Sequence, residues 1–551
     1  MRIGVFQFNP TVGAVNANAD AIVNALSTVE ADVLVTSELS LCGYPPRDLL
    51  LDDGFVSACN QALETIRARA KDCAVVVGHP RIDAATGRLR NSVSIFQHSE
   101  IIAQYDKQLL ANYDIFDESR YFEPGDSTTL FEINGIKIGV AICEDLWQGE
   151  DAHAAPTYDH NPVQTLISQG CSVILSPSAS PFVKGKQQKH IDCLLQNSRA
   201  NQVVIAMCNQ VGGYDDLIFD GSSMIVTPNG VIAEVPPFKS GLAVTQLDVD
   251  TIQSTVLSDT EACIEALVLG IRDYVCKTGH SKLFLGLSGG IDSALTATLA
   301  TIAIGTESVK GILMPSRYSS LGSIEDAEEL AERVGIETKT IPIEYMHQAF
   351  ERTFEETESP CEGLAAENVQ ARLRGLILMA YANEQKGLLL ATGNKSELAV
   401  GYSTLYGDMA GALSVIGDVY KTDVWAMSRF INEHFESLGF TCPPIPESSI
   451  TKAPSAELRP DQRDEDSLPP YDQLDEILRL HIDFDLGVEA IVSRCDIAQD
   501  TIESIVSMVD QAQFKREQSA VILKLTPRAF GRGRRMPIVM KRNWTQTREI
   551  V

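Results

Sequence analysis

Long apolar runs, paired cysteines and positive charge are all scarce in this sequence of 551 residues. No stretch approaches the roughly 18 consecutive apolar residues of a membrane-spanning helix, so the sequence argues against a membrane protein. The 12 cysteines are scattered without a CxxC pair. This pattern argues against a zinc ribbon or a disulfide framework and is typical of a reducing compartment, so we expect a cytoplasmic protein.

The shortage of positive charge bears on the ligands. Lys and Arg number 45 against 74 Asp and Glu, which gives a formal net charge of −29. A surface this acidic disfavours broad binding to nucleic-acid phosphates, so we expect no nucleic-acid partner. It does not exclude a small anionic substrate, because a local site can be positive on a negative protein.

The length indicates two or three domains, at about 100–200 residues each. Short β-rich runs alternate with amphipathic helical stretches in the first half, and prolines and polar residues interrupt the pattern near residues 236–262. We predict a mixed α/β domain over residues 1–245, a linker over 246–262 and a second domain over 263–551. In the second domain strands alternate regularly with helices, which predicts a doubly wound parallel sheet with ligands at the carboxyl ends of its strands.

The densest motif of the second domain follows a predicted strand and opens a predicted helix. Small residues there let the backbone approach a ligand, and the helix N-terminus offers N–H groups to an anion. The Walker A pattern GxxxxGK(S/T) is absent, but the GxSxG pattern of a hydrolase nucleophile elbow is present. A plain turn without a ligand is the third interpretation. The motif comprises Gly286, Leu287, Ser288, Gly289, Gly290, Ile291, Asp292 and Ser293.

Five further motifs follow in order. The run Ser-Gly-Gly-Ile-Asp-Ser resembles the pyrophosphate loop of N-type ATP pyrophosphatases, and the whole set resembles the NAD synthetases. That resemblance implies an adenine nucleotide alpha hydrolase-like fold for the second domain and an adenylated intermediate. The further motifs cover residues 314–320, 367–372, 391–397, 402–408 and 418–422.

The resemblance implies roles for single residues of these motifs. Thr392 and Lys421 join the loop in binding ATP, with Lys395 as a second candidate phosphate partner. Asp292 and Glu397 are hard oxygen donors suited to a phosphate-bound Mg²⁺, which is the expected cofactor. The positions matched to the deamido-NAD site are Asn368, Glu397 and Lys515.

Three reactive side chains of the first half each follow a predicted strand. Cys143 is a candidate nucleophile, although a free cysteine is more often a small buried apolar residue. The ordered set Glu38, Lys107, Cys143, together with residues 112–122, resembles the nitrilase (carbon–nitrogen hydrolase) family in its glutamine-amidase branch. This resemblance implies an αββα sandwich.

The chemistry accounts for the residue types. Glu38 takes the thiol proton, Cys143 attacks the glutamine amide, and Lys107 stabilises the oxyanion. The nitrilase resemblance assigns Glu118 to positioning the lysine. It assigns glutamine binding to Tyr113, Ser180 and Lys186, with Ser178 as the alternative serine.

The two resemblances together imply ATP-dependent amidation of deamido-NAD with ammonia from glutamine. We expect a shielded tunnel for neutral ammonia and a homo-oligomer, at least a dimer through the synthetase domain. One alternative is an amidase fused to an esterase-like domain that uses Ser288, with His481 as its base. Another is a nucleotide-binding regulatory module with an inactive amidase.

Overall fold

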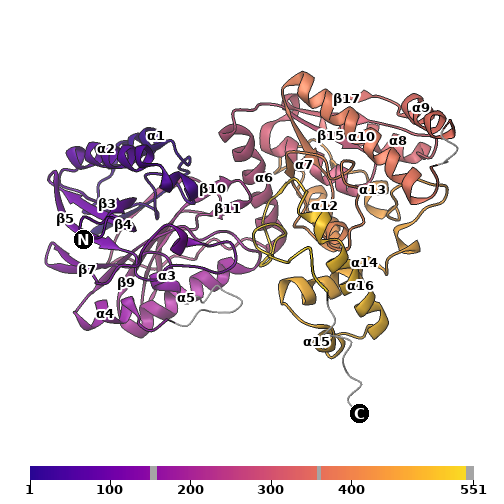
Figure 1. Cartoon of the computed structure of the whole chain (residues 1–551). Helices are drawn as coiled ribbons and strands as arrows, with labels where there is room; N and C mark the ends of the chain where they lie inside the picture. Colours follow the sequence, from indigo (N-terminus) through magenta and orange to yellow (C-terminus); the bar gives the residue numbers. More distant parts are fainter. Residues whose placement is uncertain (149–157, 357–360, 542–551) are drawn as a thin grey trace, which may run out of the picture. The chain divides into compact units, whose positions relative to one another are not determined.

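The computed structural model describes residues 1–148, 158–356 and 361–541 (Figure 1). Internal contacts divide the chain into two compact units, Met1–Lys277 and Thr278–Val551. Helix α6 (Asp259–Lys277) packs on strand β10 (Val211–Tyr214) of the first unit, although our predicted limits assign most of it to the second domain. Those limits remain a prediction. Within the described residues, every helix is too short or too polar to cross a membrane.

Two six-stranded sheets build the first unit. In each, three central strands are parallel (β1, β2 and β3; β7, β8 and β9) and the outer strands are antiparallel. The first sheet has the order β14 (Gly241–Gln246), β1 (Arg2–Gln7), β2 (Val33–Val35), β3 (Ala74–Ile82), β4 (Leu89–Gln97), β5 (Glu100–Asp106). The second has the order β13 (Gly230–Glu234), β12 (Met224–Thr227), β9 (Val204–Asn209), β8 (Val173–Ser178), β7 (Ile136–Val140), β6 (Leu130–Ile133).

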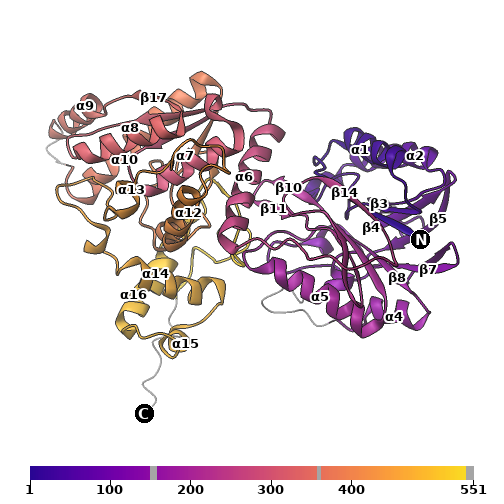
Figure 2. The ribbon, with the colours of Figure 1, turned by 180° about the vertical axis from the view of Figure 1, so that it is seen from behind.

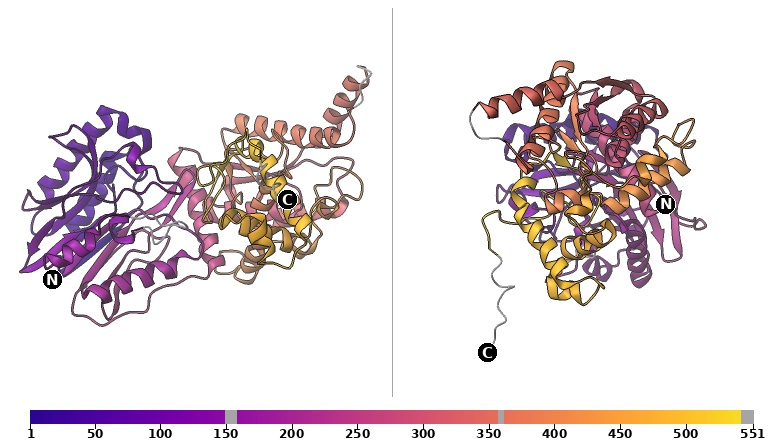
Figure 3. Two further views of the ribbon diagram at one scale, coloured as in Figure 1. Left: turned by 60° about the horizontal axis from the view of Figure 1, so that its bottom comes forward. Right: turned by 90° about the vertical axis from the view of Figure 1, so that its right-hand side faces the viewer.

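The sheets of the first unit lie face to face between helices. Helices α1 (Val15–Thr28) and α2 (Asp53–Arg69) cover one outer face, and α4 (Pro162–Ser168) and α5 (Lys186–Asn201) cover the other (Figures 1 and 2). Alternation along β2 divides its side chains: Val33 and Val35 join the core between the sheets, and Leu34 joins the core beneath α1 and α2. The predicted αββα sandwich is confirmed, and Figure 3 shows its strands enclosed by helices.

The second unit contains a six-stranded sheet in which every pair is parallel. Its order reverses between β15 and β18, the point at which such sheets open a crevice for ligands. The predicted doubly wound sheet is therefore confirmed. The order is β17 (Glu337–Thr340), β16 (Val309–Leu313), β15 (Leu283–Leu287), β18 (Leu388–Ala391), β19 (Leu413–Ser414), β20 (Val521–Ile522).

The helices of the second unit pack on the sheet or form a group of their own. Near the sheet are α7 (Ile291–Ile304), α8 (Leu321–Val334), α9 (Glu344–Glu355), α10 (Leu364–Gln385), α11 (Lys395–Val400), α12 (Lys421–Glu433) and α13 (Glu447–Thr451). The others, at the lower end of this unit in Figure 1, are α14 (Tyr471–Leu478), α15 (Val488–Val492), α16 (Gln499–Gln511) and α17 (Gln513–Arg516). A separate apolar core joins α11 and α14 to α16.

Candidate active sites

The three predicted amidase residues meet in the first unit. Glu38 follows β2, Lys107 follows β5 and Cys143 follows β7. The ammonium of Lys107 donates to Oε1 of Glu38 at 2.7 Å, and both side chains are 1% exposed. A buried ion pair of this kind is held rigidly, because neither charged group can exchange its partner for solvating water.

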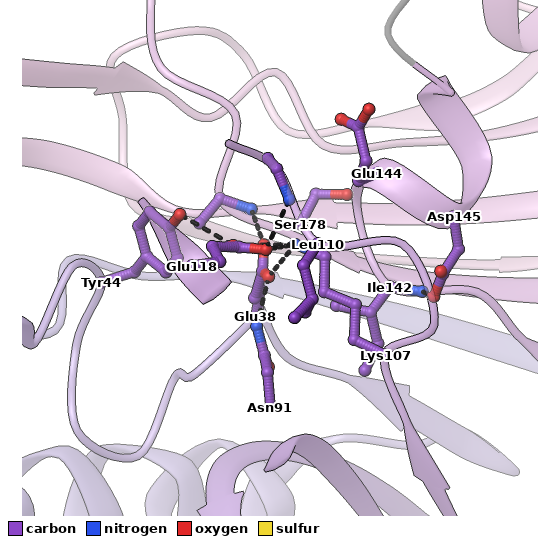
Figure 4. Close-up of polar contacts among 12 residues, drawn as sticks. Glu38, Tyr44, Asn91, Lys107, Leu110, Glu118, Ile142, Glu144, Asp145 and Ser178 are labelled. Carbon is purple, nitrogen blue, oxygen red and sulfur yellow. Dashed lines mark hydrogen bonds and ion pairs between the residues drawn. The ribbon is translucent and has the colours of Figure 1, made fainter. Parts of the chain in front are cut away.

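A second carboxylate completes the lysine's environment, as Figure 4 shows. Lys107 Nζ also donates to Glu118 at 2.9 Å. Glu118 in turn accepts from the hydroxyl of Tyr44 at 2.9 Å and from the N–H of Ala111 at 3.0 Å. This geometry supports the predicted positioning role of Glu118, and it adds Tyr44, which our sequence reasoning missed.

Cys143 occupies a sharp turn between β7 and the short helix α3 (Glu144–Trp147). Its φ of 45° lies in the left-handed region, which is rare for a residue with a side chain and is typical of strained functional turns. Burial and the charge of Glu38 raise the pKa of the thiol, and the charge of Lys107 opposes this. The resting group is therefore a thiol that needs a base to ionise.

Two further polar residues at this site were not predicted. Asp145 is fully buried and accepts from the backbone N–H groups of Gln108, Leu109 and Ile142 and from the Tyr105 hydroxyl, so it ties the lysine segment to the cysteine turn. Burial raises its pKa to about 7. Asn91 on β4 donates to Glu38. In the sequence, the one signal for Asp145 is its position two residues after the candidate nucleophile Cys143.

The three predicted glutamine-binding residues take part in two separate hydrogen bonds. The Tyr113 hydroxyl donates to Glu144 Oε2 at 2.7 Å, directly beside the cysteine. Lys186, the first residue of α5, donates to the Ser180 hydroxyl at 2.9 Å. The alternative, Ser178, lies on β8 with its hydroxyl against Ser176. The structure thus brings Ser180 to Lys186, and the glutamine roles remain predictions.

In the second unit a cavity of about 320 Å³ lies where the loops after β15 and β18 meet. The Gly-rich loop contributes to its wall, as does Thr392. Gly289 lies behind the wall with a φ of 78°, and a Cβ there would meet the Ser323 carbonyl oxygen at 2.1 Å. Only glycine fits that position. Seven of the eight predicted loop residues line the cavity: Gly286, Leu287, Ser288, Gly290, Ile291, Asp292 and Ser293.

Three charged groups face one another at this cavity. Lys421 forms ion pairs with Asp292 and, at 3.5 Å, with Glu397. Asn394 donates to the other oxygen of Asp292 at 2.9 Å. Burial and the negative charge of Asp292 raise the pKa of Glu397 to about 8, and Lys421 only partly offsets this. Two crowded carboxylates that share a cavity fit a divalent cation, whose charge would relieve their repulsion.

Not every predicted residue reaches the cavity. The prediction of Lys395 as a phosphate partner is wrong, because this side chain is fully buried and pairs with Asp418 at 3.0 Å and Asp483 at 2.8 Å. Asn368 and Lys515 instead contact the turn beside the cavity-lining Tyr402. Asn368 accepts from the Thr404 hydroxyl, and Lys515 donates to the carbonyls of Gly401 and Ser403.

The esterase alternative finds no support at Ser288. Its hydroxyl contacts Ser293 Oγ at 3.1 Å and the Gly290 N–H at 3.2 Å, within its own loop. Nδ1 of His481 lies against the carbonyl of Leu486 at 3.0 Å. The serine is thus bonded within a Gly-rich loop that lines the cavity.

Comparisons with known proteins cover the same two halves. A carbon-nitrogen hydrolase family model matches residues 2–256, and an NAD synthase model matches residues 263–542. A glutamine-dependent NAD(+) synthetase of Synechocystis sp. is 43% identical over 97% of this chain and 98% of its own. The Acinetobacter baylyi relative of the same name is 40% identical over 98% of both chains.

Solved structures agree with the sequence matches. The glutamine-dependent NAD+ synthetase of Acinetobacter baumannii, solved with adenosine diphosphate, is 36% identical with a TM-score of 0.76 and coverage of 98% of both chains. A Cytophaga hutchinsonii synthetase is 23% identical, with a TM-score of 0.82 over 98% of both chains, and supports the fold alone. These matches run through both units and leave the amidase–esterase alternative without support.

Proposed function

The chain belongs to the family of glutamine-dependent NAD(+) synthetases, and on that premise we propose how its residues divide the reaction between two sites. The enzyme is a carbon–nitrogen ligase that amidates deamido-NAD to NAD with ammonia from glutamine, at the cost of ATP. The observation that carries the assignment is the buried Glu38–Lys107 pair beside Cys143, in one chain with a Gly-rich nucleotide cavity.

The first site produces ammonia. Glu38 accepts the thiol proton as Cys143 Sγ attacks the side-chain amide carbon of glutamine, and Lys107 stabilises the oxyanion. The amide nitrogen of the intermediate takes up the proton from Glu38 and leaves as ammonia, and a thioester remains. Glu38 then takes a proton from water, whose oxygen attacks the thioester and releases glutamate and the thiol.

The second site activates the carboxylate of deamido-NAD. Asp292 and Glu397 would hold Mg²⁺, which when bound supplies positive charge to the polyphosphate. The loop amides at the start of α7 and the ammonium of Lys421 would bind phosphate oxygens. The nicotinate carboxylate attacks the α-phosphorus, pyrophosphate leaves, and ammonia displaces AMP to form the amide. Asn368 and Lys515 are proposed to hold deamido-NAD.

Ammonia must reach the second site unprotonated, because ammonium has no lone pair with which to attack. We therefore propose that it travels shielded from water. A direct test supplies glutamine labelled with ¹⁵N in its amide, together with an excess of unlabelled ammonium. Shielded transfer predicts NAD that carries mostly the label, and dilution to the bulk ratio contradicts it.

We also propose a homo-oligomer through the synthetase unit and a cytoplasmic location. Helix α10 supports the first point, since Leu376 and Met379, which are 58% and 38% exposed, lie one turn apart on it. Clustered exposed apolar residues on a helix are typical of an interface. Light scattering should report a dimer or larger assembly, and Leu376→Lys should shift it toward monomer.

The overall reaction has a simple test. A mixture of enzyme, ATP, Mg²⁺, glutamine and deamido-NAD should yield AMP, pyrophosphate, glutamate and NAD in equal amounts. The release of ADP in place of AMP would contradict adenylation at the second site. Formation of glutamate without NAD would restrict the activity to the amidase.

A further inference from the structure

Asn91 connects two catalytic groups of the amidase site and has no assigned role. It lies on β4 and is 1% exposed. Its backbone carbonyl accepts the Lys107 N–H at 2.8 Å, and its side-chain Nδ2 donates to Glu38 Oε1 at 2.7 Å. One residue therefore sets the position of the lysine backbone and of the glutamate carboxylate, as Figure 4 shows for the latter.

The contacts of Glu38 make its two oxygens inequivalent. Oε1 accepts from both Asn91 and Lys107, each at 2.7 Å. Oε2 accepts a longer bond, 3.2 Å, from the N–H of Ala179. That same N–H also contacts the sulfur of Cys143. The nucleophile thus lies on the Oε2 side of the carboxylate, where one lone pair is still available.

The orientation of Asn91 leaves an unsatisfied group. With Nδ2 on Glu38, the buried Oδ1 has no hydrogen-bond partner within the described residues. A buried acceptor without a partner destabilises a fold, so such a group in a native structure calls for an explanation. Stability of the fold alone does not explain this amide, whereas orienting a catalytic carboxylate does.

We propose that Asn91 is a positioning residue for the general base. Together with Lys107 it fills both lone pairs of Glu38 Oε1, so that Oε2 is the atom that accepts the proton from Cys143 Sγ. The proton then passes from Oε2 to the amide nitrogen, which leaves as ammonia, and Oε2 takes the next proton from water. The inference rests on the proposed amidase function and adds the identity of the base atom and the group that selects it.

The test compares Asn91→Ala with Ser94→Ala. Ser94 is a matched control, because it lies on the same strand, is fully buried and hydrogen-bonds to His79 at 2.8 Å, away from the cluster. Glutamine hydrolysis by the full-length protein is measured for kcat and KM. Asn91→Ala should lower kcat about 10- to 100-fold and change KM less than about threefold, since Asn91 contacts the base and not the glutamine residues.

A second measurement needs no turnover. Alkylation of Cys143 by iodoacetamide, followed by mass spectrometry, reports how readily the thiol loses its proton. It should slow in Asn91→Ala and stay at the wild-type rate in Ser94→Ala. Thermal unfolding of both variants shows whether they are folded, and Asn91→Asp, which keeps the shape but replaces the donor, serves as a second loss variant.

The outcomes separate the two levels of inference. If wild-type protein does not hydrolyse glutamine, the proposed function fails. If wild type is active and Asn91→Ala keeps kcat within about threefold, the positioning role is overturned. An equal loss in Ser94→Ala also overturns it, because it indicates a general structural defect. A loss that appears only in KM overturns it as well, because it indicates a role in substrate binding.

Discussion

The amidase cluster and the synthetase cavity differ in how far each is assembled before substrate arrives. In the first, the charged groups are nearly fully buried and already bonded to one another: Glu38, Lys107 and Glu118 are 4% exposed or less. In the second, Asp292 and Glu397 face an open cavity of about 320 Å³, and their side chains remain 19% exposed. The first site is preorganised, whereas the second leaves space beside its carboxylates.

The difference follows from the substrates. A neutral primary amide is small, so a tight cluster can be built around its reacting atoms without charge compensation. Deamido-NAD and ATP are large anions, so their site needs space and an arrangement of charge that changes when they bind. Lys421 forms ion pairs with both carboxylates, which fits this need. A metal ion bound by the two carboxylates would replace Lys421 as their partner, and the lysine could then bind phosphate.

The sharpest way to separate the two sites is Cys143→Ala. Glutamine-dependent NAD synthesis should fall by about three orders of magnitude or more, because no nucleophile remains. Synthesis from added ammonium should persist, as measured by NAD formation at high ammonium. Cys171→Ala is the matched control, with 6% exposure against 7% for Cys143. Failure of ammonium to rescue a folded Cys143→Ala would contradict the independence of the two sites.

Asp292→Asn tests the other half of the comparison. NAD synthesis should fall about 100-fold with either glutamine or ammonium, because the carboxylate that we propose for Mg²⁺ is gone. Glutamine hydrolysis alone should continue, as measured by glutamate release. Asp259→Asn controls for the loss of an acidic residue in the first turn of a helix. Wild-type synthesis in Asp292→Asn would remove this residue from the site.

Lys395 and Lys421, which are both buried in the second unit, should behave differently. Lys395→Met leaves Asp418 and Asp483 without their cation and should lower the free energy of unfolding by about 3–5 kcal/mol. Chemical denaturation measures this loss. Lys421→Met should mainly raise KM for ATP. If both variants raise KM for ATP equally, at temperatures where both are folded, Lys395 contributes to ATP binding and the prediction is contradicted.

The smallest effect is a pH dependence of the second unit. The pKa of Glu397 is raised to about 8 in the folded protein, so between about 4.3 and 8 the folded state binds more protons than the unfolded one. Without ligands, its stability should therefore fall as pH rises through this window. Denaturation of wild type and Glu397→Gln at several pH values should show a flatter dependence in the variant. Identical slopes would contradict the prediction.

Much of the fold could be predicted from local pattern. The helix predicted to open at the Gly-rich motif is present as α7 (Ile291–Ile304). Strand β2 and its neighbours were visible as short β-branched runs. Strand β6 was missed, and strand β5, whose apolar residues Ile101 and Ile102 are exposed, was expected without bounds as the strand before Lys107. In edge strands the alternation of apolar and polar residues is weak, because the core covers less of the strand than it does in the middle of a sheet.

The sequence motifs and their family resemblance pointed to the reactive residues better than to the residues that hold them in place. Cys143 and the Gly-rich loop stood out because each sits in a turn that few residue types tolerate. Asn91, Tyr44 and Asp145 gave no comparable signal, since ordinary polar residues on strands and loops are common. Lys395 was misassigned because its motif is continuous with Glu397, while its side chain enters the core beneath the helix.

The sequence by itself predicted the two-part organisation and singled out Cys143 and the Gly-rich loop as candidates for catalysis and phosphate binding, because these depend on short stretches with strict conformational demands. Only the tertiary structure decided which side chains hold the reactive ones. It brings Asn91 to Glu38 across 53 residues and Lys421 to Asp292 across 129 residues. Such contacts arise where the sheet topology brings together strands that are distant in the sequence, so they cannot be predicted from the local sequence pattern.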